Sequence, residues 1–241
     1  MQHYTFHVSS RCQLRCGFCT LWQKDLPLTP QPHWVNLIET QQFFTVFPFA
    51  KHYHIVGGDP SVHPNLPLLL SFLKSKGIRV HLWTHGVVPH PFWEQVVPHV
   101  DSIRLYLPAS DPGEYRRITG ETSFETLADS LILLKSKPVD LILHTPITLD
   151  TVSWLPYTYD FVFKHKIPWW IHYHPQDGYD DTSEAYLLRF RNIHNVWVFK
   201  TQFQPHFLCA AFPFDAVQDP WQRAQYAVWD FLKGIRKALG L

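Results

Sequence analysis

Apolar and polar residues follow two different rhythms along the first 175 residues of the chain. Short runs rich in β-branched and aromatic residues, with apolar positions at every second place, predict strands. Longer segments in which apolar residues recur every three or four positions predict helices. The predicted strands are 3–9, 52–56, 79–84, 102–107, 139–147 and 168–174, and the predicted helices are 33–44, 65–77, 91–100, 123–137 and 152–166.

This alternation predicts a parallel sheet with helices packed outside it, because a helix is the usual crossover between parallel strands. Six βα repeats are expected. An open doubly wound sheet and a partly closed barrel both satisfy the pattern, so the hydrophobic spacing alone does not choose between them.

Residues 176–241 do not keep that rhythm. The run VWVFKT (196–201) predicts a last strand, and EAYLLRFRN (184–192) predicts a helix. The segment 221–240 predicts an amphipathic helix, because its apolar residues at 224, 228, 231, 232, 235 and 239 share one face. We expect 1–175 to form the core and 176–241 to form a C-terminal extension packed on that core.

Composition narrows the class of protein. The chain is 46% hydrophobic and 17% charged, which suits a globular core. Its formal net charge of +1 argues against a nucleic-acid partner. The N-terminal residues do not resemble a signal peptide, and no apolar run is long enough to span a membrane. We therefore expect a cytoplasmic protein whose thiols stay reduced, with no membrane partner.

Three of the four cysteines lie in one short loop after the first predicted strand. Cys12, Cys16 and Cys19 have the spacing C-x3-C-x2-C. Three soft thiolates on one loop can hold three corners of an iron–sulfur cube, which leaves the fourth iron without a protein ligand. A tetrahedral zinc site completed by a histidine is the competing interpretation. Simple packing of buried thiols fits less well, because Arg11, Gln13 and Arg15 make the loop polar.

A second motif follows the second predicted strand. Gly57, Gly58, Asp59 and Pro60 form a turn, and in a parallel α/β fold the loops after strand ends gather on one edge of the sheet. We therefore expect the turn and the cysteine loop to lie together. The bare backbone of the two glycines would let another molecule approach closely.

The two motifs together resemble those of the radical S-adenosylmethionine (radical SAM) superfamily. That family has C-x3-C-x-aromatic-C after the first strand, and Phe18 stands in the aromatic position; it has a G-G-E-P-like turn after the second. The stretches SVHPNLPLLLSFLKSKGIRVHLWTHG and EYRRITGETSFETLADSLILL are also similar to the family, so the resemblance covers residues 3–175. It implies a partial (β/α)6 TIM-like barrel, here with a short C-terminal helical extension.

The resemblance also implies the cofactors. One [4Fe–4S] cluster would be held by Cys12, Cys16 and Cys19, and S-adenosylmethionine (SAM) would bind its open iron. The residues expected near SAM are Phe18, Gly57, Gly58, Asp59, Pro60 and Thr84. Since only Cys209 follows in the sequence, we expect no second cysteine-ligated cluster and no cysteine-rich domain in this chain.

Several positions depart from the family pattern. Asp59 replaces the usual Glu, His85 replaces the Asn of Thr-Asn-Gly, and Tyr106 stands where many members carry a ribose-binding Ser. Asp111 or His144 could supply the ribose contact instead. Arg117 either reaches the SAM carboxylate or lies on the surface.

The implied reaction starts with an electron from a donor such as flavodoxin or ferredoxin, in an oxygen-sensitive enzyme. SAM is cleaved to methionine and a 5′-deoxyadenosyl radical, which takes a hydrogen atom from a small molecule, nucleoside or short peptide. No catalytic residue can be singled out from the sequence. Cys209 is expected to be an inert buried thiol, with hydrogen-atom donation to a substrate radical as the sharper alternative.

Three other functions remain open. A glycyl-radical enzyme activase has a similar size and one cluster. The deazaguanine ring-contracting enzyme usually has Trp-Cys-Asp-Thr where this chain has Phe-Cys-Thr-Leu at 18–21. A zinc-stabilised binding module is the non-enzymatic alternative. The alternating pairs His52/His54 and His172/His174 are expected to be core residues, although the same face could line a substrate site.

Overall fold

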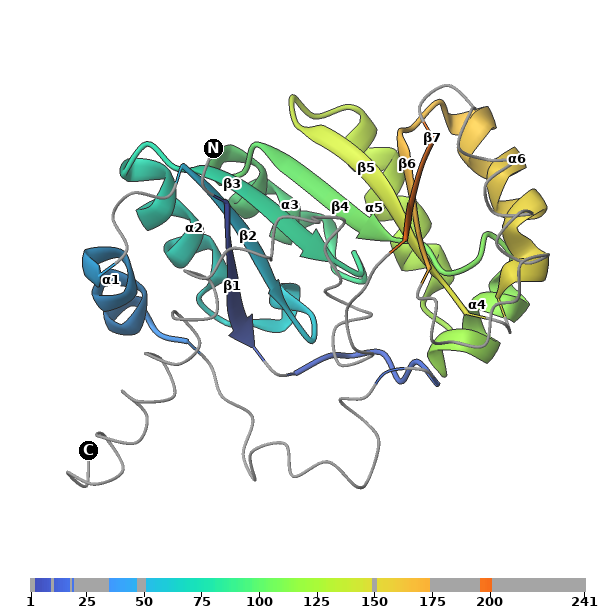
Figure 1. The fold of residues 1–241 in the computed structure, drawn as a ribbon, viewed down its shortest axis with the longest axis horizontal. Coiled ribbons are helices and arrows are strands. Elements are labelled where there is room, and N and C mark those ends of the chain that lie inside the picture. The colour runs from blue at the N-terminus through green and yellow to red at the C-terminus, as the bar shows by residue number, and fades with distance from the viewer. Residues whose placement is uncertain are drawn as a thin grey trace. The chain divides into compact units, whose positions relative to one another are not determined.

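A computed structural model describes residues 3–9, 11–17, 19, 35–46, 51–148, 151–173 and 196–200. The chain divides into two units, Met1–Ala211 and Phe212–Leu241, and all described residues belong to the first. The described residues form one parallel sheet whose strand order follows the chain (Figure 1). Its strands are β1 (His3–Ser9), β2 (His52–Gly57), β3 (Arg79–Thr84), β4 (Ser102–Tyr106), β5 (Asp140–Ile147), β6 (Trp169–Tyr173) and β7 (Val196–Lys200).

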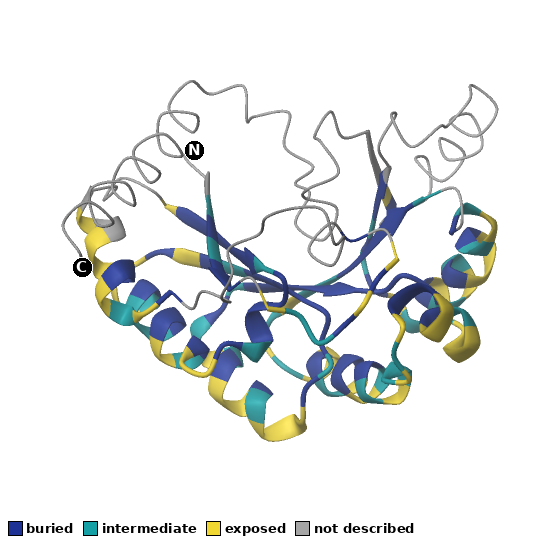
Figure 2. Cartoon of the chain, turned by 90° about the horizontal axis from the view of Figure 1, so that it is seen from below, coloured by how far each residue is buried: buried dark blue, intermediate teal, exposed yellow. Residues whose placement is uncertain are grey.

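Helices connect the strands and cover one face of the sheet. Figure 2 shows the sheet curving away from them, so that the helices lie on its convex side. They are α1 (Leu37–Val46), α2 (Leu66–Ser75), α3 (His90–Val96), α4 (Pro112–Thr119), α5 (Phe124–Lys135) and α6 (Leu155–His165), with short 3-10 turns η2 (Pro60–Val62), η3 (Val97–His99) and η4 (Val152–Trp154). No helix among the described residues is long and apolar enough to cross a membrane.

The sheet confirms the predicted parallel α/β architecture and answers the question that the spacing left open. Its strands run in sequence order, with β1 and β7 at opposite edges, as in a barrel that does not close. The predicted last strand, 196–201, is confirmed as β7, which pairs with β6 as a seventh strand of the same sheet. It lies within the segment expected to form the C-terminal extension, so part of 176–241 belongs to the core sheet. The predicted helices 184–192 and 221–240 lie outside the described residues.

One helix was not predicted. The segment that forms α4 is short and polar, so it carries no clear apolar stripe. Its ends nevertheless have good signals: the Asp111 side chain accepts a hydrogen bond from the Glu114 backbone N–H at 2.9 Å, and Gly120 adopts φ +73° after the last turn. Those caps fix both ends of α4.

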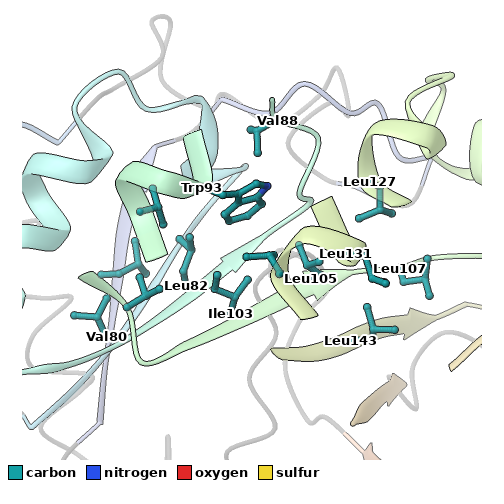
Figure 3. Close-up of a cluster of buried hydrophobic side chains, with 14 of the residues drawn as sticks. Val80, Leu82, Val88, Trp93, Ile103, Leu105, Leu107, Leu127, Leu131 and Leu143 are labelled. Atoms are coloured by element: carbon teal, nitrogen blue, oxygen red, sulfur yellow. The ribbon is translucent and has the colours of Figure 1, made fainter. Parts of the chain in front are cut away.

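The apolar core lies between the sheet and its helices. Leucine, isoleucine and valine side chains of β3, β4 and β5 alternate toward α3 and α5 (Figure 3). The largest buried side chain there is Trp93 of α3, whose Nε1 donates to Ser130 Oγ of α5 at 2.9 Å. Burying each Leu or Ile side chain contributes about 1.5–3 kcal/mol, so this layer supplies most of the stability of the described unit.

The opposite, concave face carries polar and aromatic side chains instead. Because neighbouring strand residues point to opposite faces, each apolar residue of the core is flanked by one that points inward. We call this set the inner-face cluster. It consists of His52, His54, His81, Trp83, Arg104, Tyr106, His144, Trp170 and His172, whose rings and guanidinium contact one another.

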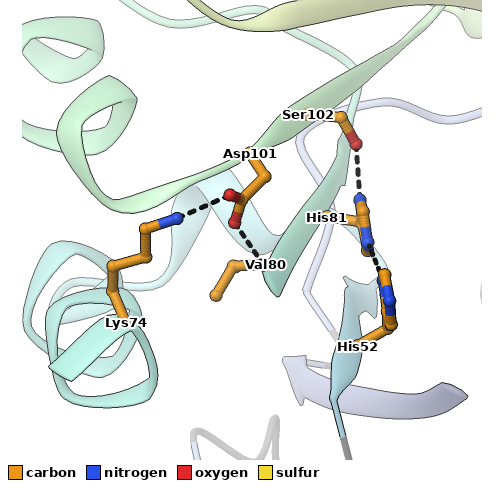
Figure 4. A network of polar contacts seen from close by, with 6 residues as sticks. All are labelled: His52, Lys74, Val80, His81, Asp101 and Ser102. Carbon is orange, nitrogen blue, oxygen red and sulfur yellow. Dashed lines mark hydrogen bonds and ion pairs between the residues drawn. The ribbon is translucent and has the colours of Figure 1, made fainter. Parts of the chain in front are cut away.

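The histidines nearest the amino ends of the strands are bonded to each other, as expected of core histidines. His52 Nδ1 lies 2.9 Å from His81 Nε2, and His81 Nδ1 lies 2.7 Å from Ser102 Oγ (Figure 4). His54 accepts from the Trp83 indole N–H at 3.2 Å. Both residues of the first predicted pair are therefore buried and hydrogen-bonded, as the core interpretation expects, whereas His174 of the second pair lies outside the described residues.

Candidate cofactor site

The cysteine loop (residues 11–19, of which 18 is not described) begins where β1 ends. The pairing of β1 with β2 shifts register between His7 and Ser9, and such irregularities redirect a strand. Beyond the shift, the Gly58 N–H donates to the Ser9 carbonyl at 2.9 Å and the Asp59 N–H to the Arg11 carbonyl at 2.7 Å. The loop and the Gly-Gly-Asp-Pro turn are thus joined at the carboxyl ends of β1 and β2, as predicted.

A second attachment holds the far side of the cysteine loop. The Arg15 N–H donates to the Thr119 carbonyl at 2.7 Å, and the Gly17 N–H donates to the Ile118 carbonyl at 3.1 Å. Both acceptors are the last residues of α4, whose carbonyl groups lack partners within the helix. The end of α4 therefore positions the loop, and the loop satisfies the end of α4.

The three cysteines lie together at this edge of the sheet. Cys16 and Cys19 are buried with Leu14 and Tyr106 in a small apolar cluster of their own, and Cys12 is half-buried beside them. Burial raises the pKa of the Cys16 thiol to about 12, with the charge of Cys19 adding to the effect. Burial also raises the pKa of Cys12, as does the charge of Asp59.

These thiols fit a site for a metal cofactor by their chemistry. Desolvation keeps Cys12 and Cys16 protonated at neutral pH, and a bound metal supplies the positive charge that makes thiolates stable there. No disulfide joins them. Across the described part of the chain, no group of three or more His, Cys, Asp or Glu side chains is arranged to hold a metal ion.

Glycine is required at both positions of the turn because the chain's own backbone passes close to them. A Cβ at Gly57 would overlap the Ser9 carbonyl oxygen, and one at Gly58 would overlap the Arg11 carbonyl oxygen. The space saved by the glycines is filled by the chain's own backbone, by the end of β1 at Gly57 and by the cysteine loop at Gly58. The approach of another molecule to the backbone of the turn stays a prediction, and these contacts leave it no space at the two Cβ positions.

Asp59 is the hub of the site. Its carboxylate is fully buried and accepts four hydrogen bonds: Oδ1 from Thr84 Oγ1 at 2.7 Å and from the Ser61 N–H at 2.9 Å, and Oδ2 from Gln13 Nε2 at 2.7 Å and from the His85 N–H at 3.3 Å. Three segments meet at this side chain: the cysteine loop, the η2 turn that begins at Pro60, and the end of β3. The predicted neighbours Asp59 and Thr84 are thus brought together.

The residues that depart from the family pattern lie next to the cysteine loop and on the inner face of the sheet. The Tyr106 hydroxyl lies 3.9 Å from Cys16 Sγ, and the His85 ring packs edge-on against Tyr106. Burial lowers the pKa of His85, while the Asp59 charge and a backbone contact from Gly58 oppose that shift. His144 is buried on the inner face, near Tyr106.

Two other candidates lie away from these groups. Arg117 is half-exposed on α4 and pairs with Glu114 at 2.7 Å, in keeping with the surface alternative. The Asp111 carboxylate is engaged as the cap of α4. The predicted residues Phe18 and Cys209 lie outside the described residues.

Two polar residues, one in the cysteine loop and one in the inner-face cluster, were not predicted to make these contacts. Gln13 is the polar residue between two cysteines that bonds to Asp59. Arg104 is a charged residue in the middle of the largely apolar run SIRLYL, and charged residues are rarely buried unless they are paired.

A parallel, incompletely closed α/β barrel with buried thiols and a Gly-Gly-Asp-Pro turn at the carboxyl ends of its first two strands defines a class of cofactor-dependent enzymes. The sequence model of the radical SAM superfamily matches residues 6–162, more than half of the chain. The chain therefore belongs to the radical SAM superfamily. The cofactors of this family are a [4Fe–4S] cluster and SAM.

Among characterised proteins, the indoleacetate decarboxylase activating enzyme of Tractidigestivibacter scatoligenes is 33% identical over 94 residues, which cover 39% of this chain and 30% of that protein. The 7-carboxy-7-deazaguanine synthase of Neisseria meningitidis serogroup B is 26% identical over 125 residues, covering 51% of this chain and 53% of that protein. The chain thus spans about a third to about half of these relatives.

The fold is similar to that of SuiB from Streptococcus suis. The structure of SuiB bound to S-adenosylmethionine aligns with a TM-score of 0.63 and 13% identity, over 86% of this chain and 52% of that one. SuiB bound to its precursor peptide SuiA aligns with a TM-score of 0.64 and 14% identity, over 81% and 48%. This likeness confirms the radical SAM type of partial barrel.

Proposed function

We propose that this protein binds one [4Fe–4S] cluster through Cys12, Cys16 and Cys19 and cleaves SAM reductively at that cluster. The cofactors would supply a 5′-deoxyadenosyl radical that takes a hydrogen atom from the substrate. The observation that carries the proposal is the convergence of three thiols and the Gly-Gly-Asp-Pro turn at one edge of the sheet, joined by the Gln13–Asp59 hydrogen bond.

A four-iron cluster suits these cysteines better than zinc does. Each cysteine of a cubane binds a different iron, so its three ligands need not surround a single ion. A closed zinc site needs four ligands around one ion, and the described residues contain no such arrangement.

The chain's own residues would position SAM. The Gly57–Pro60 turn and Thr84 lie at the edge where the cysteines lie, and Phe18 belongs to the same loop in sequence. Because the Asp59 carboxylate is already held by four donors, we propose that its main part is to fix the turn and the loop. Backbone groups of the turn then meet the methionine amine.

The substrate is proposed to be a small molecule, a nucleoside or a short peptide. The electron is proposed to come from a donor such as flavodoxin or ferredoxin. A peptide is compatible with the fold, since SuiB binds its precursor peptide SuiA. A purine-like molecule is compatible with the similarity to 7-carboxy-7-deazaguanine synthase. We keep 1–175 as the proposed catalytic core and 176–241 as the extension, with β7 contributed to the core sheet.

The test is iron binding and SAM cleavage by the full chain reconstituted without oxygen. Wild-type protein should hold about four irons, as a cubane requires, and should form 5′-deoxyadenosine when given dithionite and SAM. Cys12→Ser, Cys16→Ser and Cys19→Ser should each lose both properties, whereas Cys209→Ser keeps the iron. Wild-type protein that binds zinc and no iron would contradict the proposal.

A second candidate function is activation of a glycyl-radical enzyme. It is favoured by the similarity of 94 residues to the indoleacetate decarboxylase activating enzyme. In that case the hydrogen atom comes from a glycine of a large partner protein. Incubation with the partner, SAM and reductant should give a glycyl-radical doublet in the EPR spectrum, and its absence with every partner tested would favour the small-substrate function.

A further inference from the structure

Arg104 is a buried cation at the centre of the inner-face cluster. Its residue exposure is 7%, and its guanidinium carbon lies 5.1 Å from the Trp83 ring centroid and 4.5 Å from that of Trp170. One guanidinium nitrogen donates to Ser102 Oγ at 2.8 Å. Its Nε is buried and has no hydrogen-bond partner among the described residues.

No carboxylate of the described residues lies within ion-pair distance of this guanidinium. Asp140 acts on Arg104 only by longer-range attraction, which opposes the lowering of its pKa to about 10 by burial. The side chain therefore stays charged at neutral pH. A buried, unpaired charge costs free energy in a folded protein, and the two indole rings compensate only part of that cost.

The position of Arg104 relative to the cysteine loop matters for what could pair with it. Tyr106, two residues later on β4, reaches the cysteine loop, where its hydroxyl faces Cys16. Two residues along a strand span roughly 7 Å. Arg104 therefore lies one layer of side chains away from the cofactor site, toward the amino ends of the strands.

A second polar group lies level with Tyr106 on the neighbouring strand. His144 is paired across the sheet with Tyr106 and packs edge-on against Trp83 at 5.1 Å. Its Nε2 is buried and has no hydrogen-bond partner within the described part of the chain. It offers a hydrogen bond to a molecule that extends from the cysteine loop toward Arg104.

We propose that Arg104 binds an anionic group of the substrate, a carboxylate or a phosphate, and thereby fixes the distance between that group and the reacting carbon near the cofactors. The planar guanidinium suits such an anion because it can donate two parallel hydrogen bonds. Trp83 and Trp170 flank the charge and limit the size of the group that reaches it. The role of Arg104 in catalysis rests on the proposed function, but the binding of an anion does not.

The same chemistry could come from the carboxylate of SAM itself. The two sources differ in what Arg104 would support. If the anion belongs to the substrate, Arg104→Gln should leave the affinity for SAM unchanged. If Arg104→Gln instead binds SAM about tenfold or more weakly, the loss expected for a charged hydrogen bond, the anion is that of SAM and the proposal is overturned.

The first experiment uses acetate and phosphate as probes of the full chain. Either salt should raise the midpoint of thermal unfolding of wild-type protein above that in sodium chloride at equal ionic strength. Arg104→Gln should abolish that difference. Arg79→Gln is the matched control, because it removes an exposed arginine from the neighbouring strand and should keep the wild-type response.

Arg104→Met guards against a variant that fails to fold. Replacing an unpaired buried charge with an apolar side chain of similar length should leave the protein folded and at least as stable in chloride, but unresponsive to acetate or phosphate. The proposal is overturned if wild-type protein shows no anion response, or if Arg104→Gln and Arg104→Met keep it.

The outcome separates this proposal from the proposed function. Formation of 5′-deoxyadenosine by wild-type protein without an anion response refutes the Arg104 site alone. An anion response that depends on Arg104, in protein that never cleaves SAM, supports the site and refutes the proposed reaction.

Discussion

Gln13 Nε2 donates a hydrogen bond of 2.7 Å to Asp59 Oδ2, so that a side chain between two cysteines is bonded to the turn after the next strand. The backbone hydrogen bond from the Asp59 N–H to the Arg11 carbonyl joins the same two segments. Together they make the cysteine loop and the turn one rigid piece, because moving either would leave a buried carboxylate short of donors.

Asp59→Asn is predicted to destabilise the protein. An amide nitrogen at one Oδ position would face hydrogen-bond donors, and the loss of charge weakens the remaining bonds. The free energy of unfolding should fall by about 2–3 kcal/mol, measured by urea denaturation of the apoprotein. Asp129→Asn, at an exposed position on α5, should change it by less than about 0.5 kcal/mol.

Gln13→Ala should have a smaller effect of about 1 kcal/mol, because the His85 N–H remains on the same carboxylate oxygen. If Asp59→Asn were no more damaging than Asp129→Asn, the carboxylate would not be the hub that its four contacts indicate.

Gly58→Ala is predicted to displace the cysteine loop and to reduce its capacity for iron. The added methyl group would overlap the backbone of Arg11, which cannot rotate away as a side chain can. We expect a loss of roughly 1–3 kcal/mol in stability, together with a lower iron content after anaerobic reconstitution.

Gly17→Ala is the matched control for this prediction. It lies in the cysteine loop, but a Cβ there meets nothing within 4 Å. Its iron content should equal that of the wild type. Equal iron in both variants would mean that the loop adapts to the extra methyl group.

Tyr106→Phe is predicted to keep the fold and to make the bound cluster harder to reduce. A hydroxyl near the Cys16 sulfur withdraws negative charge from it, and hydrogen bonds to cluster sulfurs raise the reduction potential. The midpoint potential of the reconstituted variant should shift to more negative values in a spectroscopic redox titration. An unchanged potential would show that the hydroxyl does not act on the sulfur.

The acid dependence of stability should report on Asp101. Burial alone would raise its pKa, but hydrogen bonds from Lys74 Nζ at 2.6 Å and the Val80 N–H at 2.8 Å outweigh burial and lower the pKa below its usual range (Figure 4). The unfolded chain therefore takes up the proton first as the pH falls. The stabilisation is complete above the ordinary pKa of about 4 and is lost as the pH drops through the folded value.

The corresponding measurement compares Asp101→Asn with wild type by urea denaturation. The variant should be about 1 kcal/mol less stable at neutral pH, and the difference should shrink below about pH 4. Glu94→Gln is the control, because it removes a carboxylate that pairs with Lys137 and is more exposed than Asp101. Its stability should differ little from that of the wild type at either pH. A difference for Asp101→Asn that did not depend on pH would rule out this carboxylate as its source.

The strands could be predicted from the sequence because each is a short alternating run between clear helical segments, whereas their order could not, because the spacing suits both an open sheet and a partly closed barrel. β1 and β3 have the predicted bounds, His3–Ser9 and Arg79–Thr84. Helix α4 could not be found from periodicity, since its polar sequence has too few apolar positions to show a stripe. The capping residues Asp111 and Gly120 were the usable signal.

Some features of the candidate site could be predicted from the sequence and others could not. The cysteine loop and the Gly-Gly-Asp-Pro turn could be placed at one edge of the sheet, because both follow parallel strands. The Asp59 hub could not, because the bond from Gln13 depends on the course of a loop that no local pattern specifies. Similarly, the rings that surround Arg104 come from strands far apart in the sequence, and only the curved sheet brings them together.

The attachment of the cysteine loop to the end of α4 has a consequence for biosynthesis. A ribosome releases the N-terminal loop first, yet the carbonyl groups of Ile118 and Thr119 that hold it come from near the middle of the chain. At about 5–20 residues per second, the nascent loop spends several seconds without its anchor. Iron delivered to the emerging polypeptide would therefore meet cysteines that are not yet held in place. We therefore expect the cluster to be inserted late, after α4 has been synthesised.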